Sequence, residues 1–478
     1  MNQPETASVI SSKTEVSSAE YFAQRQLKQG TVGWLLLIGL GVAYVISGDF
    51  AGWNFGIAQG GWGGMFIATA LAAIMYLCLC LSMSEMSTMM PTAGGGYSFA
   101  RAAFGPFGGY LTGTAILIEY AIAPAAIAVF IGGYCESLFG INGWMIYLAC
   151  YAIFMGIHLK GAGEALKIMF AITLVAAVAL VVFIVAMIPH FNAQNLFDIT
   201  VGTAAGASHF LPHGYLGIWA AVPFAIWFFL AVEGVPLAAE EAKDPAKSLP
   251  RGLIGAMLIL TAFAMLILFL GAGAAGASTL QNSGAPLVDA LVKVYGTNTW
   301  LATFVNFVGL AGLIASFFSI IYAYSRQIFA LSRAGYLPTS LSLTNKNKTP
   351  YLAIIIPGII GFLLSLTKEG DSLILIAVFG ATISYVLILL SHIKLRLSKP
   401  DMPRPYKTPG GIVTSSIALV LAVAAVVAGF VVNPKVWFIA AAIYVVFIAY
   451  FLFYSRYHLV KGTPEEEFAN IKAAEQEL

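Results

Sequence analysis

Apolar runs of about 20 residues recur along the whole of this chain, and they restrict its fold more than any other feature. Hydrophobic residues make up 59% of the 478 positions and charged residues 10%, which is more apolar surface than a soluble domain can bury. A run of this length crosses a bilayer as an α-helix, because only a helix satisfies its own backbone groups there. The sequence therefore predicts an all-α membrane protein with 12 transmembrane helices, at 32–58, 65–84, 108–134, 141–158, 166–188, 215–240, 252–274, 301–331, 351–366, 371–397, 412–432 and 436–456.

The basic residues are distributed unevenly between the two sides of this topology. With 12 spans, 21 of the 24 Lys and Arg residues fall on one side, and Lys293, Lys368 and Lys435 fall on the other. Basic loops stay in the cytoplasm, so we expect both termini there. The polar segment 1–30 is expected to be disordered and 458–478 to be a cytoplasmic tail. The net charge of +2 gives no reason to expect nucleic-acid binding.

Two of the spans are interrupted in a similar way, five spans apart. Each interruption places a carboxylate beside glycine in the middle of an apolar run, at Gly48-Asp49 and at Glu233-Gly234. Corresponding breaks in two halves indicate a transporter of two inverted repeats, with its site between the broken helices. We expect the repeats at 31–190 and 215–400, an extracytoplasmic loop at 191–214 between them, and two further helices in 401–457. Two unrelated glycine kinks are the alternative.

Three loop signatures occur in order around these spans: SEMSTMMPTAGGGY at 84–97, the acidic stretch EEAKDP at 240–245, and SRQIFALSRAGYLP at 325–338. Together they resemble the amino acid–polyamine–organocation (APC) superfamily over about residues 30–400. The string ISGDFAGWN at 46–54 resembles its ethanolamine permease branch in particular. The resemblance implies a secondary transporter of the bacterial inner membrane, with a LeuT-like 5+5 fold, broken helices 1 and 6, and alternating access.

Asp49 is the most informative single residue. A charged side chain at bilayer depth costs roughly 2.5–3.5 kcal/mol, so it is rarely kept without a function. Amino-acid carriers that this chain resembles offer the backbone of a Gly-Ser/Ala-Gly string, followed by an apolar residue, to the substrate carboxylate. Here Ile46 replaces the first glycine and Asp49 the apolar residue. We therefore predict a substrate with an ammonium group and no carboxylate, such as ethanolamine; a simple N-cap role for Asp49 is the alternative.

The resemblance also extends to other spans that line the substrate path. Glu119 on the third span is a second cation or proton site, or an internal hydrogen-bond partner. Trp227 matches an aromatic that stacks over substrate, where a cation gains roughly 0.5–2 kcal/mol, or it is ordinary packing. The full predicted substrate site is Ser47, Gly48, Asp49, Phe50, Glu119, Tyr120, Trp227, Phe229, Ala231 and Glu233.

Candidates for ion coupling are Glu233, Ser316 and Ser319. The serines lie where sodium-coupled relatives offer hydroxyl ligands, although serines in membrane helices often bond their own backbone. Whether H⁺, Na⁺ or exchange drives transport stays open, as does the oligomeric state. We expect no cofactor and no metal, because the His and Cys residues lack ligand spacing.

Seven charged residues near the predicted cytoplasmic face form a candidate inner gate, or are ordinary solvated loop charges. They are Glu85, Arg101, Glu240, Glu241, Arg251, Arg326 and Arg333.

Three other functions compete with an ethanolamine carrier. The first is an amino acid or polyamine permease of the same superfamily in which Asp49 is a proton site. The second is a membrane enzyme, which would need clustered His, Asp or Cys at one membrane face, and the sequence shows no such cluster. The third is a transporter-like sensor, or a subunit that needs a partner.

Overall fold

The computed structural model describes residues 30, 32–297 and 299–460, with the side chains of 162–167 excluded. Our expectations of a disordered segment at 1–30 and a tail at 458–478 therefore fall almost entirely outside the described residues. In the described part the chain is helical and forms no β-strand, only two isolated bridges.

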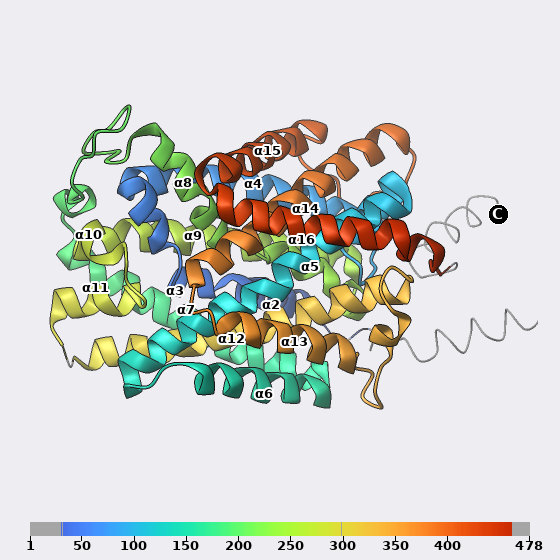
Figure 1. The fold of residues 1–478 in the computed structure, drawn as a ribbon, viewed down its shortest axis with the longest axis horizontal. Coiled ribbons are helices and arrows are strands. Elements are labelled where there is room, and N and C mark those ends of the chain that lie inside the picture. The colour runs from blue at the N-terminus through green and yellow to red at the C-terminus, as the bar shows by residue number, and fades with distance from the viewer. Residues whose placement is uncertain (1–29, 31, 298, 461–478) are drawn as a thin grey trace, which may run out of the picture.

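The elements follow one another as long helices joined by short connections (Figure 1). They are α2 (Trp34–Val45), α3 (Ser47–Phe50), α4 (Asn54–Met89), α5 (Gly96–Phe139), α6 (Trp144–Lys160), α7 (Ala162–Met187), η1 (Ile188–His190), η2 (Ala193–Phe197), α8 (Gly214–Trp227), η3 (Val232–Glu241), α9 (Pro245–Ala275), α10 (Ala277–Leu280), α11 (Pro286–Tyr295), α12 (Trp300–Arg333), η4 (Thr339–Ser342), α13 (Tyr351–Ser365), α14 (Gly370–Ser398), α15 (Ile412–Val432), α16 (Pro434–Phe453) and η5 (Ser455–Tyr457).

Every predicted apolar run lies on a helix. Among the described residues, nine helical segments are long and apolar enough to cross a membrane, and α2, α6 and α13 are shorter apolar helices. Helix α2 is short because its span is interrupted after Val45 and resumes in α3 and α4.

The connection between the first two spans is tight. The runs at 32–58 and 65–84 leave residues 59–64 between them, and there two helices meet at a kink at Gly61, within the range of α4. Gly61 has φ 67°, a left-handed conformation that glycine adopts at little cost, and the ring of Pro212 fills the space where a side chain would project. Helix α4 therefore contains the outer part of span one and all of span two.

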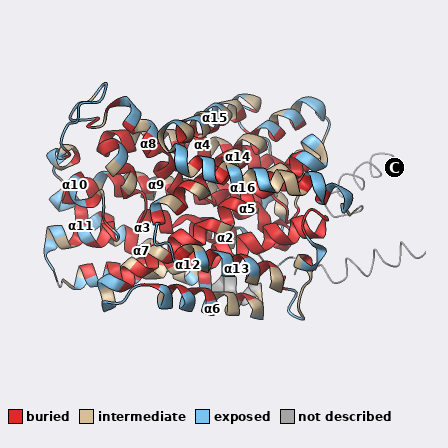
Figure 2. Cartoon of the chain, in the orientation of Figure 1, coloured by how far each residue is buried: buried red, intermediate tan, exposed pale blue. Residues whose placement is uncertain are grey.

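The helices pack in two sets around the middle of the molecule. Helix α5 packs against α14, α12 and α13, and α12 also contacts α7 and α6. In the other set α4 packs against α8 and α9, and α2 packs against α9. Buried residues concentrate between these sets, while α6, α15 and α16 show many exposed residues (Figure 2).

One end of the bundle collects most of the charged residues of interest. At this end, which we call the basic end, α4, α12 and α14 finish and α2, α5 and α9 begin. Arg333 is the last residue of α12, and Glu85 lies one turn from the end of α4. The short helices α10 and α11, which the apolar runs do not predict, lie toward the opposite end (Figure 1).

Candidate functional site

The first broken helix unwinds at the position that the sequence predicted. Helix α3 has four residues, Ala51 after it is extended at φ −157° and ψ 157°, and α4 starts at Asn54. Gly48 lies directly against the second break, because a Cβ there would stand 2.5 Å from the backbone oxygen of Trp227. Glycine at this position therefore allows the two chain breaks to touch.

The second break lies between α8 and η3, at residues 228–231. Ala231 has φ 79°, a left-handed conformation that glycine adopts more readily than alanine. An alanine there costs roughly 1–2 kcal/mol. The second break therefore forms with an alanine at this position, at a cost in backbone strain.

Trp227 joins the two breaks. Its indole Nε1 donates a hydrogen bond to the Ala51 carbonyl oxygen at 3.0 Å, and its ring stands edge-on to Phe130 with centroids 6.3 Å apart. Phe229 packs on Tyr76 with centroids 5.5 Å apart. Both predicted aromatics therefore lie at the breaks and pack within the chain itself.

Asp49 is completely buried, and neither carboxylate oxygen has a hydrogen-bond partner among the described residues. It is also separate from two other buried acids, Glu119 and Glu233, neither of which acts on Asp49. A buried carboxylate in this state needs either a proton or a cationic ligand. The N-cap alternative has no support here, because no side-chain cap hydrogen bond occurs at the start of α3 or α4.

The other residues of the first break face α12. Ser47 and Ser316 share a hydroxyl hydrogen bond of 2.8 Å, and Ser316 donates to the Tyr44 carbonyl oxygen at 2.7 Å. Phe50 packs over glycines of α12, while its carbonyl oxygen accepts a bond from the Tyr134 hydroxyl at 2.9 Å. Ser319 bonds its own helix, at the Ala315 carbonyl oxygen. Ser316 therefore contacts the first break, and Ser319 does not.

Glu119, Tyr120 and Glu233 come together in a buried cluster. The Tyr120 hydroxyl donates to Glu233 Oε1 at 3.4 Å, and both oxygens of Glu119 and Oε2 of Glu233 are without a hydrogen-bond partner. Tyr76 and Tyr385, whose hydroxyls are 2.7 Å apart, complete the cluster. The sequence motifs do not point to these two tyrosines; a tyrosine within an apolar span was the signal that could have found them.

The acids at the end of η3 form two separate ion pairs with α12 at the basic end. Glu241 accepts from Arg326 Nη2 at 2.9 Å and from the Tyr322 hydroxyl at 2.6 Å. Glu240 accepts from Arg333 Nη2 at 2.8 Å and from the Ala93 backbone N–H. Four of the seven predicted gate residues thus form ion pairs, one buried and one partly buried, rather than a solvated loop.

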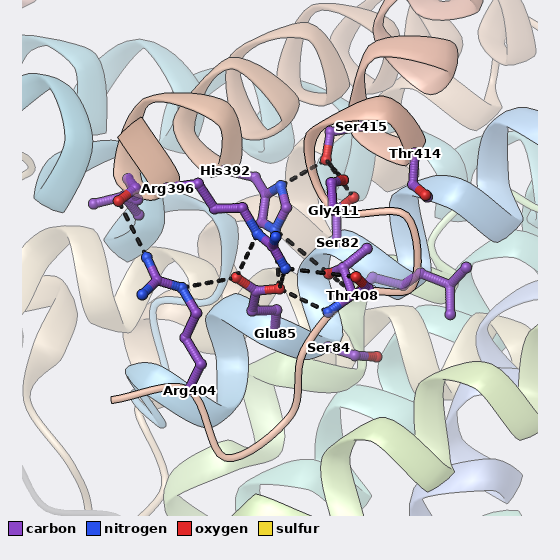
Figure 3. Close-up of polar contacts among 12 residues, drawn as sticks. Ser82, Ser84, Glu85, His392, Arg396, Arg404, Thr408, Gly411, Thr414 and Ser415 are labelled. Carbon is purple, nitrogen blue, oxygen red and sulfur yellow. Dashed lines mark hydrogen bonds and ion pairs between the residues drawn. The ribbon is translucent and has the colours of Figure 1, made fainter. Parts of the chain in front are cut away.

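Glu85 is the centre of a second set of contacts, shown in Figure 3. Its fully buried carboxylate accepts from Arg396 Nη2 at 2.5 Å, from Arg404 Nε at 2.9 Å and from the Thr408 backbone N–H at 2.7 Å. His392 Nε2 stands 3.4 Å from the same carboxylate. These partners come from α14 and the segment after it, where the sequence pattern indicated only charges that set the topology.

The remaining two gate candidates behave differently from each other. Arg101 donates to the Tyr336 hydroxyl and lies over its ring, 5.4 Å from the centroid. Arg251 is exposed on α9, and no ion pair is found for it among the described residues. The predicted network therefore consists of local clusters, with Arg251 outside them.

The backbone also closes the basic end. Val32 N–H donates to the Glu241 carbonyl oxygen at 3.0 Å, and Lys243 N–H donates to the Val32 carbonyl oxygen at 2.8 Å. The start of the first broken helix is therefore tied to the end of the second.

Comparison with known proteins agrees with this architecture. The amino acid permease family model matches residues 6–453. The chain is 28% identical to the branched-chain amino acid permease BcaP of Bacillus subtilis, over 80% of this chain and 84% of the relative, and 26% identical to BcaP of Lactococcus lactis, over 72% and 78%. It is 26% identical to the methylthioribose transporter of Bacillus subtilis, over 78% and 81%.

These relatives are transporters rather than enzymes, and none of the three is named as an ethanolamine permease. The more specific part of the resemblance is thus not supported by them. From the family match over almost the whole chain and the apolar helices, the protein belongs to the amino acid permease family of the APC superfamily and is a multi-pass membrane transporter.

Proposed function

We propose that the protein is a secondary transporter that moves a small amino compound across the bacterial inner membrane by alternating access, with 12 spans and both termini in the cytoplasm. The observation that carries this proposal is the contact between two broken helices, at Gly48 and Trp227, beside buried carboxylates that have no cationic partner among the described residues. Broken helices that meet in this way form the substrate sites of inverted-repeat transporters.

The packing of the helices supports two repeats of five spans. If the repeats are equivalent, span 3 (α5) corresponds to span 8 (α12), and span 10 (α14) corresponds to span 5 (α7). The contact of α5 with α14 should then have a counterpart between α12 and α7. That contact is present. Likewise, span 2 (α4) corresponds to span 7 (α9), and span 6 (α8) corresponds to span 1 (α2). The contact of α4 with α8 has its counterpart between α9 and α2. Helices α15 and α16 would be the two additional spans.

An amino acid is the substrate that the relatives favour. Two of the three relatives are named as branched-chain amino acid permeases, and this chain shares their family. In this proposal Asp49 carries a proton, because an ionised Asp49 would repel a substrate carboxylate bound at the same break. Its burial without a partner agrees with a neutral carboxyl group.

A carboxylate-free amine, ethanolamine above all, is the second candidate, and Asp49 is the specific observation that favours it. An ionised Asp49 with two unsatisfied oxygens offers a site for an ammonium group, which has donors but no acceptor. Asp49 would then occupy the position that a substrate carboxylate needs.

The two candidates differ in uptake by proteoliposomes and in the effect of Asp49→Asn. We would measure uptake of labelled leucine and labelled ethanolamine, each with the other compound and putrescine as unlabelled competitors. If leucine is taken up, and Asp49→Asn changes the pH dependence of that uptake rather than the affinity for leucine, the result supports an amino acid as the substrate. Ethanolamine uptake that leucine does not inhibit, and that Asp49→Asn abolishes, supports the amine. Uptake of no amino compound above that of empty liposomes contradicts both.

A further inference from the structure

Two carboxyl groups, Glu119 on α5 and Glu233 on η3, face each other in the interior. Glu119 is 0% exposed and Glu233 is 3% exposed, and Tyr120, the residue next to Glu119 on α5, hydrogen-bonds Glu233. Three of their four oxygens have no hydrogen-bond partner, and the fourth accepts from Tyr120 at 3.4 Å. No cationic side chain of the described residues pairs with either acid, so the local negative charge is not balanced.

The other titratable groups around the pair are neutral donors. They come from four elements around the pair: Tyr44 on α2, Tyr76 and Cys80 on α4, Tyr120 on α5 and Tyr385 on α14. Arg326 on α12 acts on Tyr44, but its guanidinium is bound to Glu241. The surroundings can therefore hydrogen-bond a charge but cannot neutralise one.

Two ionised carboxylates cannot remain adjacent in such a place. Like charges about 4 Å apart repel by about 4 kcal/mol even at an effective dielectric constant of about 20. When two carboxyl groups share a site, one of them keeps its proton. That proton forms an O–H···O⁻ bond across the pair, which satisfies two of the unpartnered atoms and removes one charge.

We infer that Glu119 and Glu233 together hold one exchangeable proton, and that this pair, distinct from Asp49, is the coupling-proton site of the transporter. The coupling role rests on the proposed transport function, whereas the shared proton does not.

The pair also lies where the proposed motion would change it. Glu233 belongs to the second broken helix, and Glu119 belongs to α5, which packs in the other set of helices. Movement of η3 away from α5 would separate the acids and hydrate them, so that the proton leaves to water on that side and both groups ionise. When the acids come together again with access to the opposite side of the membrane, they take one proton from the water there. The pair then again carries a single negative charge.

The shared proton can be tested on purified protein, without transport, by infrared difference spectroscopy between low and high pH. A carboxyl group that gains a proton gives a C=O band. We expect Glu119→Gln, Glu233→Gln and the double variant to lose the same band to the same extent, because removal of either acid removes the shared proton. Glu136→Gln, which changes an exposed acid on the same helix, should retain it. Additive losses in the double variant, or a band unchanged in all three, would overturn the shared proton.

The coupling role has a separate readout in proteoliposomes that contain a pH-sensitive dye. In the unaltered protein and in Glu136→Gln, entry of the added compound (leucine or ethanolamine, whichever is taken up) should acidify the interior. In Glu119→Gln and Glu233→Gln this acidification should be lost. Substrate entry without acidification in the unaltered protein would overturn the coupling role. Displacement of the carboxyl band by added substrate at constant pH would instead show an organic ammonium group at the pair, which also overturns it.

Discussion

The indole Nε1 of Trp227 donates a hydrogen bond to the Ala51 carbonyl oxygen at 3.0 Å, and this bond joins the breaks of two helices that are 176 residues apart. Ala51 is extended between α3 and α4, so no helical N–H reaches its carbonyl oxygen. The tryptophan thus satisfies a backbone group that the interruption leaves free, which is a requirement inside a membrane.

Trp227→Phe should therefore weaken the protein and its transport together. The loss of a buried hydrogen bond leaves the Ala51 oxygen unsatisfied, at about 1–3 kcal/mol. Trp437→Phe is the matched control, because Trp437 is equally buried and its Nε1 has no hydrogen-bond partner among the described residues. We expect a lower unfolding temperature and a raised KM for uptake in Trp227→Phe relative to the control. Equal effects of the two variants would mean that the bond contributes nothing.

Gly48→Ala should separate the two breaks. A Cβ at this position would stand 2.5 Å from the Trp227 carbonyl oxygen and 3.2 Å from the Phe228 Cα, both of which are backbone atoms that cannot move independently. Gly156→Ala, on α6, meets no atom within 4 Å and serves as the control. We expect uptake to fall at least tenfold in Gly48→Ala and to stay near the original rate in Gly156→Ala. Normal uptake by Gly48→Ala would show that the breaks are not in close contact during transport.

Ala231→Gly should stabilise the protein, unlike most changes to glycine. The left-handed φ of 79° costs alanine roughly 1–2 kcal/mol relative to glycine, and this gain exceeds the entropic cost of glycine in the unfolded chain. The control is Ala225→Gly inside α8, which should lose about 1 kcal/mol. Thermal unfolding of the two variants should therefore shift in opposite directions. A lower unfolding temperature for both variants would mean that the backbone at position 231 is not strained.

Glu85→Gln should loosen the basic end. The substitution removes the charge that holds Arg396 and Arg404, and breaking a buried ion pair on one side costs about 3–5 kcal/mol. We expect a lower unfolding temperature and faster reaction of the buried thiol of Cys80, on the same helix, with a permeant maleimide. Glu136→Gln, at an exposed acid, should change neither quantity. If the two variants match, the Glu85 contacts do not hold this end together.

Several parts of the fold follow from the order of residues alone. The apolar runs predict the helices because burial in a membrane requires long uncharged segments, and all of them are found as helices. The break at Gly48-Asp49 is equally local, since glycine and a charge next to each other disfavour a continuous buried helix. The assignment to the APC superfamily, based on short strings around the spans, is confirmed by the family match.

The partners of each charged group were decided by the tertiary structure. Glu85 is 323 residues from Thr408, and Tyr120 is 113 residues from Glu233, to which its hydroxyl donates. No local pattern encodes such pairings, because they depend on how α14, η3 and the segment after α14 are placed by packing. The sequence by itself therefore determined a bundle of apolar helices with two interruptions and its family. The three-dimensional packing decided that Glu119 and Glu233 meet, that Asp49 stays apart, and that Glu85 is bound by two arginines, since contact between distant residues is a property of the folded chain.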